Sequence, residues 1–290
     1  MMKLKTMVGD HPITLPLKRG EVAPQGVALD IADVARASSA FKRVVRGMEF
    51  DVAELAIVTF LIAKAHGKPL ALLPAVVAAR FQHPFLAYNA ARGPLTPAGL
   101  AGKKIGIRSY SVTTGAWMRS ILWHDHGVQP DAVQWITLDE PHVAEFQDPP
   151  NVTRVGGGKD MVSMLRDGEI AAAILGEGLP KEDWCQPLIA DPAAAASDWQ
   201  QRHGAIQINH MLVVRQSLLD QHPEAVKDVY QAFAQSRGIA LAAGAAPLPF
   251  GFEANRRNLE VAIACAYEQR LIPQRYSVDE LFTDVTRALA

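Results

Sequence analysis

The chain has 290 residues, and its 29 lysines and arginines against 30 aspartates and glutamates give a net charge of −1 at pH 7. Apolar residues make up 49% and charged residues 20%, a globular composition that excludes a largely disordered chain. No segment gathers a basic stripe, so a nucleic-acid partner is not expected.

The sequence alternates apolar runs of strand length with helical patterns. Expected strands cover residues 4–8, 27–31, 50–55, 70–77, 85–88, 104–107, 133–137, 170–175 and 206–214. Expected helices cover residues 38–47, 116–122, 159–166, 223–243 and 253–269, with a short last one from 278. This alternation predicts an α/β fold with a mainly parallel sheet flanked by helices in each of two lobes. The segment 93–97 is rich in glycine and proline, which is typical of a loop, and we expect a boundary between the lobes there.

The first residues, the apolar runs and the cysteines indicate in which cellular compartment the protein is expected. The first residues lead directly into a strand, without the apolar segment that a signal peptide needs. The most apolar run, 53–65, is interrupted by Glu54 and Thr59, so no membrane span and no membrane partner are expected. We therefore expect a cytoplasmic protein. Cys185 and Cys265 lie far apart, which favours reduced thiols and leaves a disulfide open.

A turn rich in hydroxyl groups follows the expected strand at 104–107. Ser111, Thr113 and Thr114 can cap the helix that begins there, and the first N–H groups and the helix dipole favour an anion. The turn is therefore a candidate seat for the carboxylate of a small organic acid. The alternative is an ordinary N-cap between a strand and a helix.

Candidate proton carriers follow or occupy expected strands. His83 can exchange a proton near neutral pH. The planar guanidinium of Arg80 can bind a carboxylate through two N–H groups. The alternative for this pair is a surface turn before Pro84. His210, in the last expected strand, is a second acid–base candidate or a hydrogen-bonded structural histidine.

Two further positions place carboxylates near strands. Asp10 and His11 follow the first strand, where Asp10 either lines the site or caps a turn. Glu54 interrupts an apolar run, so its carboxylate must be paired or hydrogen-bonded, and we expect it to have a raised pKa. Arg119, on the helix after the anion turn, is expected on a solvated or salt-bridged face, with contact to the ligand as the alternative.

Metal and phosphate motifs are weak in this sequence. His124 and His126 come closest to a metal-ligand pair, but on a helix they do not share a face. The glycines at 156–158 lack both the phosphate-loop and the dinucleotide spacing. Neither a metal nor a cofactor is therefore expected.

Several segments together carry a family resemblance. They are residues 49–55 (Glu-Phe-Asp-Val-Ala-Glu-Leu), 80–83 (Arg-Phe-Gln-His), Ser109-Tyr110 with Thr113 and Trp117, 164–170 (Met-Leu-Arg-Asp-Gly-Glu-Ile) and 251–260 (Gly-Phe-Glu-Ala-Asn-Arg-Arg-Asn-Leu-Glu). In this order and spacing the chain resembles the 4,5-dihydroxyphthalate decarboxylases over nearly its whole length. The segment at 164–170 is common to many binding proteins, whereas the first and last are more specific.

The resemblance implies a fold and an activity. The fold is that of type II periplasmic binding proteins, with lobe I formed by residues 1–88 and 211–290, lobe II by 89–210, and the ligand in the cleft between them. The activity is non-oxidative loss of CO2 from a dihydroxylated aromatic acid, which yields 3,4-dihydroxybenzoate. An acid must protonate the ring carbon, and a cationic or N–H-rich pocket must hold the other carboxylate.

The resemblance, read together with the residues above, gives a set of expected site residues. The expected catalytic residues are His83, His210 and Glu54. The expected substrate contacts are Asp10, His11, Arg80, Ser109, Tyr110, Ser111, Thr113, Thr114 and Glu177.

Two departures from the family pattern affect the substrate. Ser109 stands where the family has an acidic residue, and Glu177 stands where it has an arginine, so a carboxylate partner is replaced by a repelling charge. A solute-binding protein of a transporter for a small organic anion is therefore the alternative, against which the missing export signal counts. A biosynthetic enzyme on the same fold is a third interpretation, for which we find no reactive-residue signature. A homo-oligomer is left open.

Overall fold

A computed structural model describes residues 1–156 and 158–289, apart from the side chain of Glu177. The chain divides into two compact units. The first comprises Met1–Arg80, Ile208–Ala264 and Ile272–Ala290, and the second comprises Phe81–Gln207 and Cys265–Leu271. The chain thus passes into the second unit after Arg80 and returns at Ile208, whereas the sequence analysis places these changes after residues 88 and 210.

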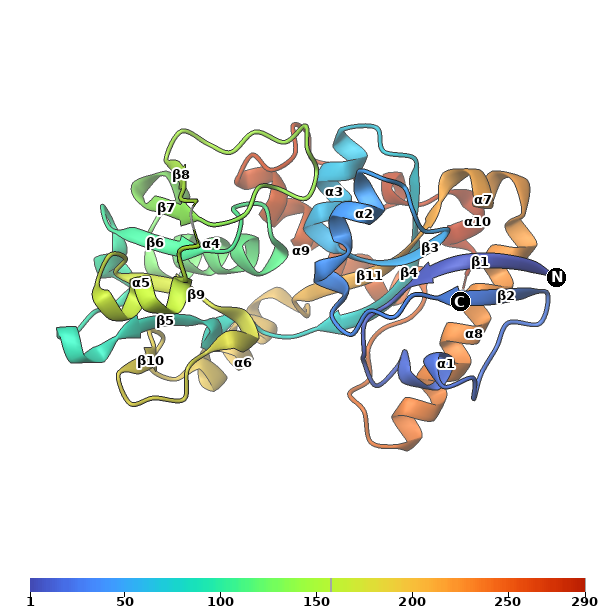
Figure 1. Cartoon of the computed structure of the whole chain (residues 1–290), viewed down its shortest axis with the longest axis horizontal. Helices are drawn as coiled ribbons and strands as arrows, with labels where there is room; N and C mark the ends of the chain where they lie inside the picture. The colour runs from blue at the N-terminus through green and yellow to red at the C-terminus, as the bar shows by residue number, and fades with distance from the viewer. Residues whose placement is uncertain (157, 290) are drawn as a thin grey trace. The chain divides into compact units, whose positions relative to one another are not determined.

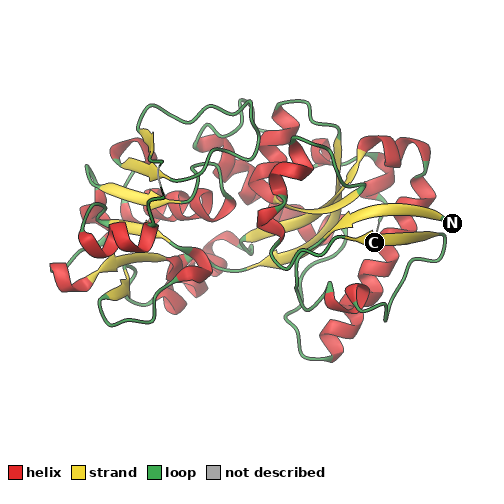
Figure 2. Ribbon diagram, viewed as in Figure 1, coloured by secondary structure: helices red, strands yellow, loops and turns green. Residues whose placement is uncertain are grey.

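The first unit is built on a sheet in the order β2-β1-β3-β11-β4 (Figures 1 and 2). Its strands are β1 Met2–Met7, β2 Val27–Ile31, β3 Val52–Ala56, β4 Leu70–Ala79 and β11 Ile208–Arg215. β1 to β4 share one direction, and β11 runs antiparallel to its neighbours β3 and β4. β3 and β4 are near-continuous apolar runs because strands covered on both faces bury both sets of side chains.

Helices pack against this sheet. They are α1 Leu15–Lys18, α2 Phe41–Val45, α3 Ile57–Ala65, α7 Gln216–Gln221, α8 Pro223–Ala242, α9 Phe252–Glu268, whose last residues belong to the second unit, and α10 Asp284–Arg287. In α8, Val226, Val229 and Phe233 are buried at helical spacing, so this amphipathic face holds the helix on the core. α8 also packs beside α1 (Figure 1). Ser236 of α8 donates to the carbonyl of Ile13 (2.7 Å) and so ties the loop after β1 to this helix.

The second unit has a sheet in the order β10-β5-β9-β6-β7-β8. Its strands are β5 Leu86–Asn89, β6 Lys104–Ile107, β7 Gln134–Thr137, β8 Val152–Arg154, β9 Ala172–Ile174 and β10 Cys185–Pro187. Its helices are α4 Thr113–His126, α5 Met161–Asp167 and α6 Pro192–His203. β5 runs antiparallel to β9 and β10, while the other strands share one direction. The prediction of a mainly parallel sheet in each of two α/β lobes is therefore confirmed.

Short 3₁₀ helices occupy several connections. They are η1 Ala37–Ser39, η2 His83–Phe85, η3 Ala90–Arg92, η4 Pro97–Leu100, η5 Pro130–Ala132, η6 Gly176–Gly178 and η7 Asp279–Leu281. The helix expected over residues 38–47 is η1 followed by α2. Of the glycine run at 156–158, Gly157 lies outside the described residues.

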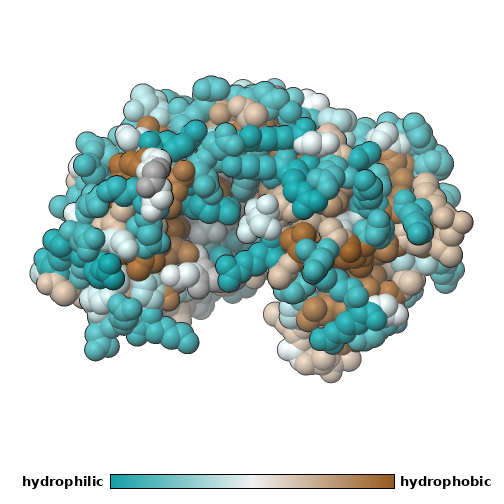
Figure 3. Space-filling view, in the orientation of Figure 1, coloured by the Kyte–Doolittle hydropathy of each residue, from teal (hydrophilic) through white to brown (hydrophobic). Residues whose placement is uncertain are grey.

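Each unit encloses an apolar core of its own. Core side chains of the first unit include Leu4, Val52, Leu73, Leu212 and Phe233. Those of the second include Ala87, Ile136, Met164, Leu165 and Ile170. Figure 3 shows a surface covered mainly by hydrophilic side chains, and the large hydrophobic residues that are exposed are Met1, Ile239 and Tyr267.

Cys185 and Cys265 are both buried and free. The disulfide that the sequence left open is therefore not formed, and both residues are thiols. Among the described residues, no helix is both long enough and apolar enough to cross a membrane.

Candidate functional site

Three side chains from separate parts of the chain meet at one edge of the first unit's sheet. His11 follows β1, Glu54 lies in β3 and His210 lies in β11. The register pairs His210 with Ala56 at the end of β3 and with Ala78 at the end of β4. Because β1, β3 and β4 share one direction, their carboxyl ends lie at this edge, which is where open α/β sheets bind ligands.

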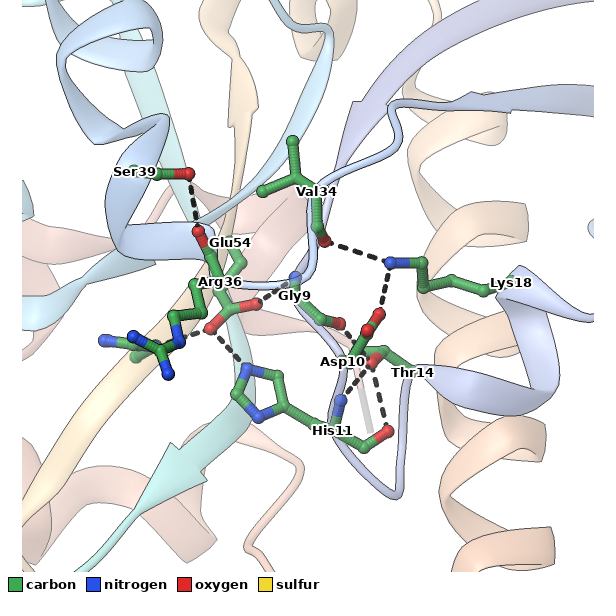
Figure 4. A network of polar contacts seen from close by, with 10 residues as sticks. Gly9, Asp10, His11, Thr14, Lys18, Val34, Arg36, Ser39 and Glu54 are labelled. Carbon is green, nitrogen blue, oxygen red and sulfur yellow. Dashed lines mark hydrogen bonds and ion pairs between the residues drawn. The ribbon is translucent and has the colours of Figure 1, made fainter. Parts of the chain in front are cut away.

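Glu54 joins the two histidines through a single oxygen. Its Oε1 lies 2.7 Å from Nε2 of His11 and 2.5 Å from Nδ1 of His210. Its other oxygen, Oε2, accepts the backbone N–H of Gly9 at 2.8 Å. The Glu54 side chain is completely buried, whereas those of His11 and His210 are 25% and 21% exposed. Figure 4 shows Glu54 between Gly9 and His11. The exposed part of the cluster therefore belongs to the two imidazoles.

The carboxylate of Glu54 is ionised. Burial alone would raise its pKa, but hydrogen bonds from His11 and His210, together with the positive charge of these rings, hold the pKa well below its usual range. The expected raised pKa is therefore wrong, because burial acts here together with two donors on one oxygen. An ionised carboxylate is only an acceptor, so each histidine donates through the nitrogen that faces it. The second nitrogen of each ring is then the one that can exchange a proton with a ligand.

The loop after β1 is held in shape by Thr14. Its hydroxyl accepts the backbone N–H of His11 at 2.9 Å and donates to the carbonyl of Gly9 at 2.6 Å, as Figure 4 shows. The Phe41 ring meets the His210 ring edge-on, with the ring centroids 5.1 Å apart. The sequence analysis did not name Gly9, Thr14 or Phe41 as site residues. The hydroxyl three residues after His11 is the pattern of a side-chain-to-backbone turn, a signal that could have indicated Thr14.

Two further expected residues lie in the first unit. Arg80 directly follows β4, and its backbone N–H donates to Oδ1 of Asn209 (3.1 Å), the residue before His210. Arg80 therefore stands at the same edge of the sheet as the three-residue cluster. Asp10 instead forms an ion pair with Lys18, which also donates to the carbonyl of Val34 (Figure 4).

The expected anion turn lies in the second unit. Ser109, Ser111 and Thr113 are buried there, and Thr114 is half-buried. α4 begins at Thr113, and its N-cap, Val112, gives no side-chain hydrogen bond to the first turn. The N-cap position is therefore not occupied by any of the hydroxyl residues that the sequence analysis named.

Tyr110 and Arg119 belong to the interior of the second unit. The guanidinium of Arg119 lies over the Tyr110 ring, 3.8 Å from its centroid, and near the Trp135 ring. Its Nε donates to Oε1 of Gln269 at 2.7 Å, and the side chain is completely buried. The expectation of a solvated or salt-bridged face is wrong for Arg119, because stacking on aromatic rings lets a guanidinium leave water.

His83 also lies in the second unit, in η2. It is 1% exposed, and among the described residues its ring nitrogens have no hydrogen-bond partner. Burial lowers its pKa from 6.5 to about 4, so the ring is neutral at neutral pH. The side chain of Glu177 lies outside what the structure describes.

The structure thus brings His11, Glu54 and His210 together and places Arg80 at the same edge of the sheet. Asp10 aside, the other expected residues with described side chains belong to the second unit; they are His83, Ser109, Tyr110, Ser111, Thr113 and Thr114. Their roles at a substrate stay predictions.

Comparison with known proteins gives two sequence matches of the same name. No protein-family model matches the chain. The chain is 29% identical over 255 residues to the 4,5-dihydroxyphthalate decarboxylase of Comamonas testosteroni. This match covers 83% of this chain and 76% of that protein. A protein of the same name from Pseudomonas putida is 29% identical over 219 residues, covering 68% of this chain and 81% of that protein. The resemblance to 4,5-dihydroxyphthalate decarboxylases is confirmed.

Solved structures show the same architecture at low sequence identity. The alkanesulfonate-binding protein SsuA from Xanthomonas axonopodis pv. citri, bound to MOPS, has a TM-score of 0.57 and 14% identity, with 97% of each chain covered. The desulfurization enzyme DSZB has a TM-score of 0.60 and 13% identity, covering 99% of this chain and 98% of that one. These neighbours confirm the periplasmic-binding-protein-like fold that the resemblance to the 4,5-dihydroxyphthalate decarboxylases implies. A binding protein and an enzyme share this fold, so the fold alone does not decide the chemistry.

Proposed function

We propose that the chain is a decarboxylase that removes CO2 from a dihydroxylated aromatic acid such as 4,5-dihydroxyphthalate. Support comes from the similarity to two proteins of that name over most of the chain. The observation that carries the proposal is the buried, ionised Glu54 whose single oxygen engages two partly exposed imidazoles.

The reaction replaces the bond between the ring carbon and the carboxylate with a C–H bond. One proton is consumed, and the electron pair of the broken bond returns to the ring as CO2 leaves. A hydroxyl group para to that carbon assists when it loses its proton, because its electrons then raise the basicity of the ring carbon. The site must therefore accept one proton from oxygen and deliver one proton to carbon.

His11 and His210 suit these two tasks because an imidazole can both donate and accept a proton. Glu54 orients both rings and stabilises whichever ring is an imidazolium, while the Gly9 N–H fixes the carboxylate. In this mechanism Glu54 is a positioning residue and does not touch the substrate. Arg80, at the same edge, binds through the N–H groups of its guanidinium the carboxylate that the product retains.

The proposal is tested by Glu54→Gln, a change that keeps the size of the side chain and removes its charge. We expect kcat with 4,5-dihydroxyphthalate to fall by at least about 100-fold, because neither histidine is then held or charged as the reaction requires. Since Glu54 acts through the histidines, the pH profile of kcat should also shift, which a merely structural role would not cause.

The chain offers a matched control in a second histidine–glutamate pair. His124 Nε2 lies 2.8 Å from Oε2 of Glu268, with both side chains more than 40% exposed. Glu268→Gln should leave kcat unchanged. An unchanged kcat in Glu54→Gln would contradict the proposed role, and binding of the acid without CO2 release by the unmodified chain would favour solute capture.

A further inference from the structure

The same three side chains present the donor set of a metal centre. One ring nitrogen each from His11 and His210 and one carboxylate oxygen from Glu54 lie within 4.8 Å of one another. Two imidazoles and a carboxylate bind first-row transition metals such as Zn²⁺, Fe²⁺, Mn²⁺ and Co²⁺. The spacing of these residues along the chain, 11, 54 and 210, resembles no metal motif, which is why the sequence analysis expected no metal.

The contacts converge on one point. Both imidazoles face the same oxygen, Oε1, so one ion placed between them meets all three ligand atoms. The Gly9 N–H occupies Oε2 and turns Oε1 toward the histidines, which is the orienting role that hydrogen bonds to metal ligands commonly play. Phe41 against the His210 ring and Thr14 behind the His11 backbone restrain the two imidazoles further.

The charge balance also favours a cation. Within residues 1–156 and 158–289, the ion pairs of Glu54 are those with His11 and His210. Lys18, the lysine drawn near this loop in Figure 4, is engaged by Asp10 and by the Val34 carbonyl. When both histidines are neutral, the cluster therefore keeps one buried negative charge that a divalent ion would neutralise.

We propose that His11, Glu54 and His210 bind one divalent transition-metal ion. Nitrogen and oxygen atoms bound to the same ion at its usual bond lengths lie about 3.0 Å apart at a right angle and about 3.4 Å apart at the tetrahedral angle. The ion therefore replaces the protons between these atoms, and the 2.5 and 2.7 Å contacts widen by about 0.3 to 0.9 Å. The exposed side of the two rings leaves coordination positions for water or for the vicinal oxygens of a dihydroxylated ligand. The inference does not rest on the proposed reaction, since it concerns the chain without substrate.

The test uses the full chain, stripped with a chelator, dialysed and titrated with Co²⁺ alone. We expect one Co²⁺ per chain by elemental analysis, with visible absorption bands typical of nitrogen and oxygen ligands. Glu54→Gln and His210→Gln should weaken binding by at least about 100-fold. His124→Ala, which removes the exposed histidine of the matched pair, should bind Co²⁺ as the unmodified chain does.

A folded, unmodified chain that takes up no Co²⁺, or variants that bind it as tightly as the unmodified chain, would overturn the inference. The first of these readouts needs no variant, so misfolding of a variant does not obscure it. A separate assay of CO2 release keeps the two proposals apart. An ion bound without decarboxylation would overturn the proposed reaction alone, and decarboxylation without any ion uptake would overturn the metal site alone.

Discussion

At the scale of single residues, burial alone does not set the charge of a side chain in this protein. Glu54 and His83 are both almost completely buried. Glu54 has three donors and stays ionised, whereas His83 has no hydrogen-bond partner among the described residues and stays neutral. Hydrogen bonds to the charged form therefore decide between the two outcomes.

The buried His83 predicts a dependence of stability on pH. Its folded-state pKa of about 4 lies below the unfolded value of 6.5, so the unfolded chain binds more protons between these values. Its neutral form thus stabilises the fold fully above pH 6.5, and this contribution is lost as the pH falls toward 4. We expect a loss of about 3 kcal/mol over this window in denaturant unfolding, since each unit of pKa difference corresponds to about 1.4 kcal/mol.

The comparison that isolates His83 is the variant His83→Gln. Asp125, His126 and Arg202 also act on this imidazole, and burial lowers the pKa of His126 in the same direction. Those groups remain in the variant, so its stability should fall less steeply between pH 6.5 and 4. Equal slopes for both proteins would show that His83 does not cause the loss.

The twelve site residues expected from the sequence include His11, Glu54 and His210, but the sequence indicated neither their contacts nor the supporting residues Gly9, Thr14 and Phe41. A carboxylate in an apolar run must have partners, and this argument identified Glu54. That its partners are His11 and His210 follows from strand pairing over long sequence distances, which one sequence does not reveal. The pKa of Glu54 and the burial of Arg119 were mispredicted for the same reason, since both depend on those distant neighbours.

At the scale of elements, the site depends on where strands end and how the following loop is tied. Thr14 holds the loop after β1 through hydrogen bonds to His11 and Gly9. Thr14→Val should cost about 1–2 kcal/mol in the free energy of unfolding, because the His11 N–H and the buried Gly9 carbonyl lose their hydrogen bonds to the hydroxyl.

Thr14 should also affect catalysis through His11. We expect Thr14→Val to lower kcat more than it changes KM for 4,5-dihydroxyphthalate, while Thr14→Ser, which keeps the hydroxyl, restores both. A loss of stability with kcat intact would limit Thr14 to a structural role.

The end of α5 gives a prediction that tests the fold of the second unit. Gly168 ends this helix with a left-handed φ of +77°, and an added Cβ would lie 2.5 Å from the guanidinium carbon of Arg92. Arg92 donates to the carbonyls of Arg166 and Asp167, so it cannot move without losing these bonds. Gly168→Ala should therefore cost about 2–3 kcal/mol of unfolding free energy.

Gly127, which ends α4, is the matched control. It has a similar φ of +71°, but an added Cβ would meet nothing within 4 Å. Gly127→Ala should lower the free energy of unfolding by about 1 kcal/mol, because only the left-handed conformation is unfavourable for alanine there. Equal losses in the two variants, measured by urea unfolding, would contradict the role assigned to Arg92.

Element prediction succeeded where apolar runs are long and failed where they are short. β4 and α8 each bury a long apolar pattern and were predicted close to their observed bounds. β8 and β10 have three residues each at sheet edges, with mostly uncovered side chains, so they carry no periodic signal. α6 was missed as well, because its alanine-rich segment buries few residues.

At the scale of the whole molecule, the α/β architecture follows from the order of elements, and the chemistry does not. The alternation of strands and helices predicts two mainly parallel sheets, which the structure confirms. Solved structures with this fold include both a binding protein and an enzyme. The choice between them therefore rests on the cluster of His11, Glu54 and His210 and on the similarity to the decarboxylases.

The most direct test of this account is to incubate the purified chain with 4,5-dihydroxyphthalate and to follow CO2 and 3,4-dihydroxybenzoate by chromatography. We expect both products to form in equal amounts, one of each per substrate consumed. A folded chain that shows a thermal shift with the acid but releases no CO2 would contradict the decarboxylase function.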